Sequence, residues 1–254
     1  MRKQSKTLTQ KRTAQKRADR ALKKAALSDW TMHIRNLTAQ FQALVKSTPV
    51  RPLTDIDDLR GSGLYMLYFV GKHKPVAAYT TTANRNRSKR WGEPIYIGVA
   101  TTTRHKNKLR GVDHRSGNAL QAALKNHIKS ISSVNEHMVL DVRDFYYQAL
   151  CIDPINAEIG KIALTDLHKP IWNTVVKGFA NHHVGQTRYA QKRSRWDILH
   201  MGRSWGAHAQ WNDEGTEEIL LELEEHYAHQ KNFRRQIQRE NTIYKKLKEQ
   251  GLAA

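Results

Sequence analysis

Two short stretches of the chain each place a tyrosine next to a glycine, Gly63-Leu64-Tyr65 and Tyr96-Ile97-Gly98. Both stretches are rich in strand-forming residues, and on adjacent strands the two phenols can face each other across one surface of a sheet. A nearby glycine allows another backbone, or a phosphate, to come close. Because aromatic residues are common in strands, the alternative is that each tyrosine is a packed residue with a satisfied hydroxyl.

Three more polar residues follow the tyrosines in order. His127 falls in a predicted helix, 119–131, whose apolar residues share one side with it. Glu158 falls in a second predicted helix, 157–167, and Asn173 ends the segment His168-Lys169-Pro170-Ile171-Trp172-Asn173. A basic nucleic-acid-binding protein without catalysis would account for the charge of the chain but not for this ordered set.

In this order, residues from about 61 to 209 resemble the GIY-YIG nuclease superfamily. They are most similar to the branch of type II restriction endonucleases that cut GC-rich palindromes. The more specific part of the resemblance is the second half, which contains Gly178-Phe179-Ala180-Asn181-His182, Gly185, Arg188, Gln191, Ser194-Arg195-Trp196-Asp197, Leu199-His200 and Gly202-Arg203. The order strand, strand, helix, strand, helix predicts an α+β fold in which helices cover a small antiparallel sheet. Apolar residues at helical spacing predict helical N- and C-terminal extensions, which lie outside the resemblance, and Gln230 and Glu240 interrupt the apolar seam of the C-terminal one.

The resemblance also implies a role for each residue of the ordered set. Tyr65 would activate or orient the attacking water, and Tyr96 would position that water or the scissile phosphate. His127 would assist the tyrosine or a phosphate oxygen, Glu158 would hold a single Mg²⁺ per active site, and Asn173 would brace the site. One metal with hydrogen-bond donors can supply a deprotonated water, charge neutralisation and a stabilised leaving oxygen.

The chain departs from the family pattern at two positions. The family arginine four residues before the helix histidine is replaced by Ala123, and Arg110, Arg115 or Lys125 could take its place. The family spacing back from Asn173 leads to Lys161 rather than to Glu158, one helical turn earlier. If both positions are lost, the chain binds DNA without cutting it.

Several polar and basic residues are candidate DNA contacts. Arginine and asparagine make bidentate contacts to guanine and adenine in the major groove, although phosphate contacts are common too. A loop is expected from Thr80 to Arg90, between the tyrosine strands, and it contains two of the candidates. The candidates are Arg85, Arg87, Arg188, Gln191, Arg193, Arg195 and Arg203. Trp196 and Trp205 could stack on bases, with core packing as the alternative.

The charge of the chain predicts a polyanion partner. The 254 residues include 43 Lys and Arg against 23 acidic residues, a formal net charge of +20, and phosphate neutralisation releases condensed counterions. No apolar run is long enough to span a bilayer, and no secretory signal is recognisable, with a mitochondrial-type presequence as an alternative. The single cysteine, Cys151, excludes a disulfide framework and a thiolate zinc site, so we expect a cytoplasmic protein.

We expect three parts: a basic arm and amphipathic helix over 1–50, a GIY-YIG nuclease domain with DNA-recognition insertions over 51–212, and a C-terminal helix over 213–254. The arm is either a solvated tail or a phosphate contact. The flanking helices pack on the core or join subunits, and a palindromic target suggests a homodimer or homotetramer on double-stranded DNA. A companion DNA methyltransferase in the host is a further expectation.

Two other nuclease classes fit less well. A PD-(D/E)xK site would use Asp153-Pro154 and Glu158-Ile159-Gly160-Lys161, but one residue too many separates Glu158 from Lys161. A histidine-metal nuclease would use Asn181-His182-His183. Adjacent histidines are unsurprising in a chain with 13 of them.

Overall fold

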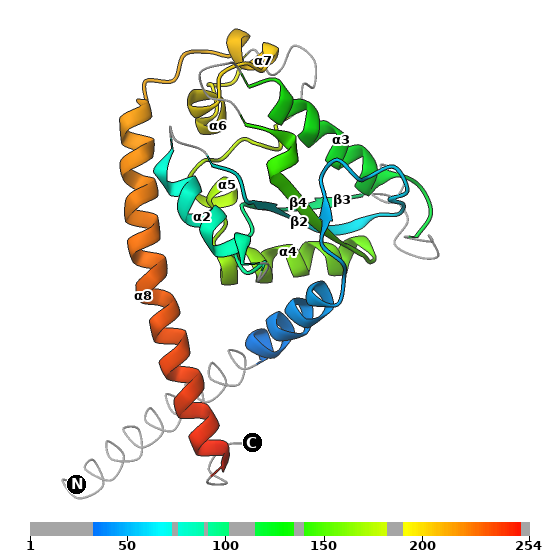
Figure 1. Ribbon diagram of the computed structural model, residues 1–254, viewed down its shortest axis with the longest axis vertical. Helices are drawn as coiled ribbons and strands as arrows, with labels where there is room; N and C mark the ends of the chain where they lie inside the picture. Colours follow the sequence, from blue (N-terminus) through cyan, green and yellow to red (C-terminus); the bar gives the residue numbers. More distant parts are fainter. Residues whose placement is uncertain are drawn as a thin grey trace, which may run out of the picture.

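The centre of the protein is a four-stranded antiparallel sheet (Figure 1). The computed structural model describes residues 33–72, 76–88, 91–101, 115–134, 140–181 and 190–249. The strand order is β1-β4-β2-β3. The strands are β1 (Arg51–Pro52), β2 (Gly63–Phe69), β3 (Tyr96–Ala100) and β4 (Phe145–Cys151), the last preceded by a short 3-10 helix, Val142–Asp144. This sheet with its covering helices confirms the predicted α+β class.

The two helices predicted around the site residues are confirmed. They are α3 (Ala119–Ser132) and α4 (Pro154–His168), and α4 begins where the Asp153 side chain caps it and a proline fits the first turn. A C-terminal helix is also present after residue 215. The other helices in the described ranges are residues 33–46, α2 (Ala77–Arg87), α5 (Ile171–Thr174), α6 (Arg195–Leu199), α7 (Ser204–His208) and α8 (Thr216–Glu249).

Strand β2 is buried along its whole length because helices cover both faces of the sheet. One face carries Tyr65 and Tyr96 and packs in a large core with residues of α2, α3 and α5. The other face packs against α4 and the helix at 33–46, where Phe41 meets Leu64 and Ala157. The two tyrosines predicted to share a surface therefore lie on the same face, between the sheet and α3.

Helix α2 lies between the tyrosine strands, so the loop expected over 80–90 is wrong from 80 to 87, and Lys89 and Arg90 lie outside the described residues. The buried side of α2 includes Tyr79, Thr82 and Asn86. The Asn86 side-chain amide donates to the carbonyls of Phe69, at 3.1 Å, and Glu93, at 2.9 Å. Because polar residues occupy positions on the buried side of α2, the apolar residues of this stretch do not show the spacing that would predict a helix.

Helix α8 runs along α2 at one side of the molecule (Figure 1). Its contacts are partly polar: the Thr82 and Tyr227 hydroxyls form a hydrogen bond, and Arg85 Nη1 donates to Gln230 Oε1 at 3.1 Å. Gln230 Nε2 also donates to the carbonyl of His168 at 2.8 Å. Gln230, a polar residue within the predicted C-terminal helix, is thus a buried contact of that helix with its own core.

Candidate active site

Tyr65 on β2 and Tyr96 on β3 lie close together because of the strand register. Tyr65 is opposite Gly98, and Tyr96 is opposite Leu67, so both phenols point to the same face. Their ring centroids are 6.2 Å apart. A Cβ on Gly98 would lie less than 3.0 Å from the Tyr65 ring and hydroxyl. The glycine of the second motif therefore provides the space that the tyrosine of the first motif occupies.

Helix α3 brings His127 to the Tyr65 hydroxyl. The distance between Tyr65 Oη and His127 Nε2 is 2.6 Å, and the imidazole is only 1% exposed. Leu120, Leu124 and Ile131 share the buried side of α3 with His127, so the helical spacing of the apolar residues directs the imidazole at the sheet. Tyr65 and His127 thus form a buried hydrogen-bonded pair in which a proton can lie on either atom.

Both phenols hold their protons strongly. Burial raises the pKa of Tyr65 well above its ordinary value. Burial also raises the pKa of Tyr96 to about 12, against a smaller lowering effect of its hydrogen bond with Tyr65. The charge of Glu158 raises the Tyr96 pKa further. Both tyrosines are therefore neutral near pH 7, and either one could act as a base only by passing its own proton to a neighbour or with a cation nearby.

The Glu158 carboxylate, on α4, is close enough to Tyr96 for its charge to raise the pKa of that phenol. Its side chain is 55% exposed, and Lys161 Nζ lies 3.3 Å from Glu158 Oε2. In the described ranges, no cluster of three or more His, Cys, Asp or Glu side chains could hold a metal alone. Mg²⁺ is usually held by one or two carboxylates, several waters and substrate phosphates. A single accessible carboxylate whose charge acts on Tyr96 fits an ion whose remaining ligands come from solvent and DNA.

Asn173 lies at the outer side of β3, the edge strand, and binds the backbone of the strand that carries Tyr96. Its Oδ1 accepts from Ile97 N and its Nδ2 donates to Ile97 O, both at 2.8 Å. Arg115 is exposed just before α3, and Arg110 lies outside the described residues. The structure therefore brings Tyr65, Tyr96, His127, Glu158 and Asn173 to one region around β3.

The prediction that Arg203 contacts DNA is wrong. Its side chain is fully buried, and its guanidinium pairs with Asp197 at 2.6 Å and with backbone carbonyls. The position looked like a DNA contact because it lies in a basic stretch, yet a guanidinium can be buried when all its donors find acceptors.

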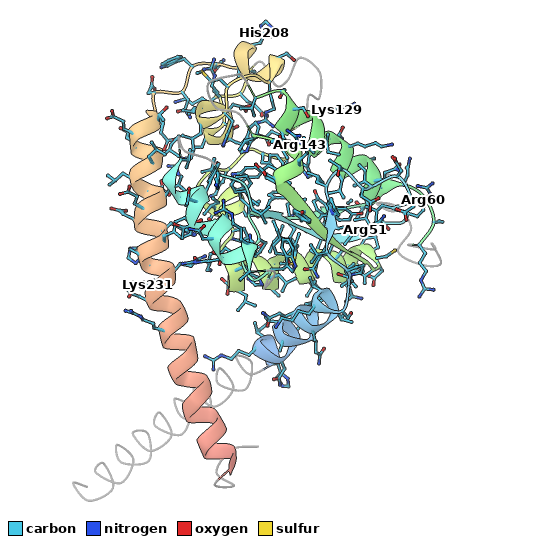
Figure 2. All side chains as sticks on the ribbon, viewed as in Figure 1. Arg51, Arg60, Lys129, Arg143, His208 and Lys231 are labelled. Carbon is cyan, nitrogen blue, oxygen red and sulfur yellow. The ribbon has the colours of Figure 1, made fainter. Side chains whose placement is uncertain are left out.

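The other candidate DNA contacts differ in their surroundings. Arg195 pairs with Glu214 and Glu222, and Arg85 pairs with Glu93 at 3.1 Å. Arg87 donates to the carbonyls of Val70 and Gly71. Arg188 lies outside the described residues. Basic side chains project from several different elements, among them Lys129 on α3 and Lys231 on α8 (Figure 2).

A short parallel bridge presents two of the candidates together with a tryptophan that sequence reasoning did not single out. Arg193 N donates to Gln210 O at 2.9 Å, and Gln210 N donates to Gln191 O at 3.0 Å. Trp211 is 73% exposed, and the Arg193 guanidinium lies 5.9 Å from its ring centroid. A tryptophan next to a basic run is a weak sequence signal, because only the structure shows that its ring is on the surface.

Comparison with known proteins agrees with this geometry. The family model described as the Eco29kI GIY-YIG domain matches residues 57–227. No curated protein matches the chain. Among the described residues, no helix is long and apolar enough to cross a membrane.

Proposed function

Because the chain belongs to the Eco29kI GIY-YIG family of restriction endonucleases, we propose that it makes Mg²⁺-dependent double-strand cuts at a specific, GC-rich palindromic DNA sequence. The observation that carries the proposal is the buried Tyr65–His127 pair, 2.6 Å apart, with Tyr96 on the same sheet face. The Glu158 carboxylate near Tyr96 supports the metal requirement.

The short hydrogen bond suggests how Tyr65 can act as a base without first ionising. As the water oxygen bonds to phosphorus and the bond from phosphorus to the leaving oxygen breaks, Tyr65 Oη takes the water proton and passes its own proton to His127 Nε2. The leaving oxygen takes up a proton from solvent. This relay requires a neutral imidazole that accepts at Nε2, and it avoids the free phenolate that burial disfavours. Tyr96, which stays protonated because burial raises its pKa, donates a hydrogen bond to a phosphate oxygen.

Glu158 is the residue that would hold the metal. When bound, Mg²⁺ would neutralise charge on the phosphate and lower the pKa of the attacking water. The ion pair between Lys161 and Glu158, 3.3 Å long, must break when the metal ion binds the carboxylate. Asn173 holds the backbone N–H and carbonyl of Ile97. Because Tyr96 is the preceding residue, these contacts also help to fix the position of its phenol.

A palindromic target requires two-fold symmetry, so the enzyme would act as a homodimer or homotetramer. Subunit contact is supported by three exposed isoleucines on α4, Ile155, Ile159 and Ile162. Gln191, Arg193 and Trp211 would contact DNA through the exposed bridge. We place the enzyme in the cytoplasm, with a companion DNA methyltransferase protecting the host.

The test is incubation of the purified protein with plasmid DNA in Mg²⁺ or in EDTA. Discrete bands that require Mg²⁺ are expected, and mapping their ends gives the site and the cut position. Glu158→Ala should raise the Mg²⁺ concentration needed for cleavage, whereas Lys161→Ala should lower it. If Lys161→Ala is the more damaging change, the assignment of the metal ligand is wrong by a helical turn.

The second candidate function is sequence-specific DNA binding without cleavage. It is favoured by Ala123, in place of the family arginine, and by the ammonium group of Lys161 on the carboxylate of Glu158. Retarded but intact DNA with and without Mg²⁺ would establish it and overturn the nuclease proposal.

A further inference from the structure

The ring of Phe179 lies flat against the imidazole of His127. The two ring centroids are 4.4 Å apart and their planes differ by 16°. The same phenylalanine meets Tyr96 edge-on, with centroids 5.2 Å apart, and is itself fully buried. Phe179 therefore touches two of the three aromatic groups of the candidate active site.

The backbone that carries Phe179 is held by one buried guanidinium. Arg203 Nη1 donates to Phe179 O at 2.9 Å and to Asn181 O at 3.1 Å, and Nη2 donates to Gly178 O at 3.0 Å. Nε donates to Asp197 Oδ1 at 2.6 Å, and the guanidinium carbon lies 4.1 Å from the centroid of the Trp196 ring. Since the guanidinium is planar and rigid, these contacts fix the three carbonyls relative to α6.

We propose that Phe179, held in place by Arg203, is a positioning residue for the Tyr65–His127 pair. The proposal rests on the proposed function of that pair. An imidazole relays a proton only when its ring plane aims Nε2 at the hydroxyl. Phe179 is stacked on the imidazole and so restricts rotation of that plane. Displacement of a reacting group by about 1 Å can cost about a hundredfold in rate. The conformation of the 178–181 turn therefore controls the geometry of the catalytic pair.

Phe145 provides a matched control that separates a positioning role of Phe179 from ordinary core packing. Phe145 is as fully buried as Phe179 and belongs to the same core, but its ring neighbours include Phe69, at 5.1 Å, and Trp172, at 5.7 Å. Phe179→Leu and Phe145→Leu remove the same ring from the same core. Only the first change removes a ring from His127.

The experiment compares the full-length wild type with Phe179→Leu, Phe145→Leu and Arg203→Lys. It measures kcat for plasmid cleavage in Mg²⁺, Kd for DNA in EDTA, and Tm. We expect similar decreases in Tm for the two leucine variants, DNA affinity within about threefold of wild type, and a 10- to 100-fold lower kcat for Phe179→Leu alone. Arg203→Lys should lower kcat similarly. The double variant that carries both Phe179→Leu and Arg203→Lys should have a kcat no lower than that of the slower single variant. Should Arg203→Lys not fold, Asp197→Asn replaces it.

A second readout does not depend on activity. The proton between Tyr65 Oη and His127 Nε2 should give a downfield NMR resonance, assigned by its loss in Tyr65→Phe. The resonance should broaden or vanish in Phe179→Leu and persist in Phe145→Leu. Equal loss of kcat in both leucine variants, or an unchanged resonance in Phe179→Leu, would overturn the positioning role. An intact resonance pattern in a wild type that does not cut DNA would refute the nuclease proposal and leave the positioning of the pair established.

Discussion

Replacing Gly98 by alanine should misplace Tyr65 without removing any reactive group. The added Cβ would lie less than 3.0 Å from Tyr65 Cζ and Oη and 2.8 Å from Tyr96 Cε1. Ordinary contacts between carbon atoms are about 3.5–4.0 Å, so the phenol must move by about 1 Å. A shift of that size should lower kcat roughly a hundredfold. Overpacking of this kind typically costs about 1–3 kcal/mol, so Tm should fall by a few degrees.

The assay is single-turnover cleavage of a duplex that contains the mapped site, with DNA affinity measured separately in EDTA. Gly92→Ala is the matched control, because nothing lies within 4 Å of the Cβ position at Gly92. That variant should cleave at the wild-type rate. If Gly98→Ala also cleaves at the wild-type rate while folding normally, the position of the Tyr65 hydroxyl does not limit the reaction.

Three further outcomes are expected. Tyr65→Phe should bind DNA with wild-type affinity and lose about 10²–10⁴ in kcat, because the proton relay through the hydroxyl is gone; a wild-type rate would refute the relay. Trp211→Ala should weaken DNA binding about tenfold without changing its salt dependence, since stacking involves no phosphate, whereas Leu221→Ala, at another exposed position, should have no effect. Stability should be greatest below about pH 10 and fall as the pH rises toward 12, because burial raises the pKa of Tyr96 from an ordinary value near 10 to about 12 in the fold. Calorimetry should show that the stability of Tyr96→Phe falls less steeply between pH 10 and 12 than that of the wild type. An equally steep fall would mean that other groups cause the loss of stability.

The sheet and the helices around the site were predictable because each has a local signal. Strands β2 and β3 combine strand-forming residues with bounding glycines, and the apolar spacing of α3 includes His127. Helix α2 was missed since Thr82 and Asn86 on its buried side are satisfied by partners remote in sequence. Hydrophobic periodicity cannot detect a buried position whose polar group is paired by the tertiary structure.

The site residues differ in predictability for a similar reason. The family order placed Tyr65 and His127 in the chain, but only the fold shows that they are hydrogen bonded. Arg203 was misassigned because its acceptors are backbone carbonyls, which have no sequence signature. The burial of Phe179 against His127 likewise depends on a turn whose conformation no local pattern predicts.

The contacts at the outer side of β3 have a consequence for how the protein behaves at high concentration. An unpaired edge strand is a template for strands of other molecules, and proteins that leave one open tend to aggregate or exchange segments. Here Trp172 N donates to Ile95 O at 3.0 Å, and the Asn173 side chain pairs with both backbone groups of Ile97, in the manner of a missing strand. The opposite edge is the two-residue strand β1, which ends in Pro52 and so lacks a donor there. Each edge of the sheet is thus blunted by a different means, and loss of the Asn173 amide would open the edge beside Tyr96 to templated self-association.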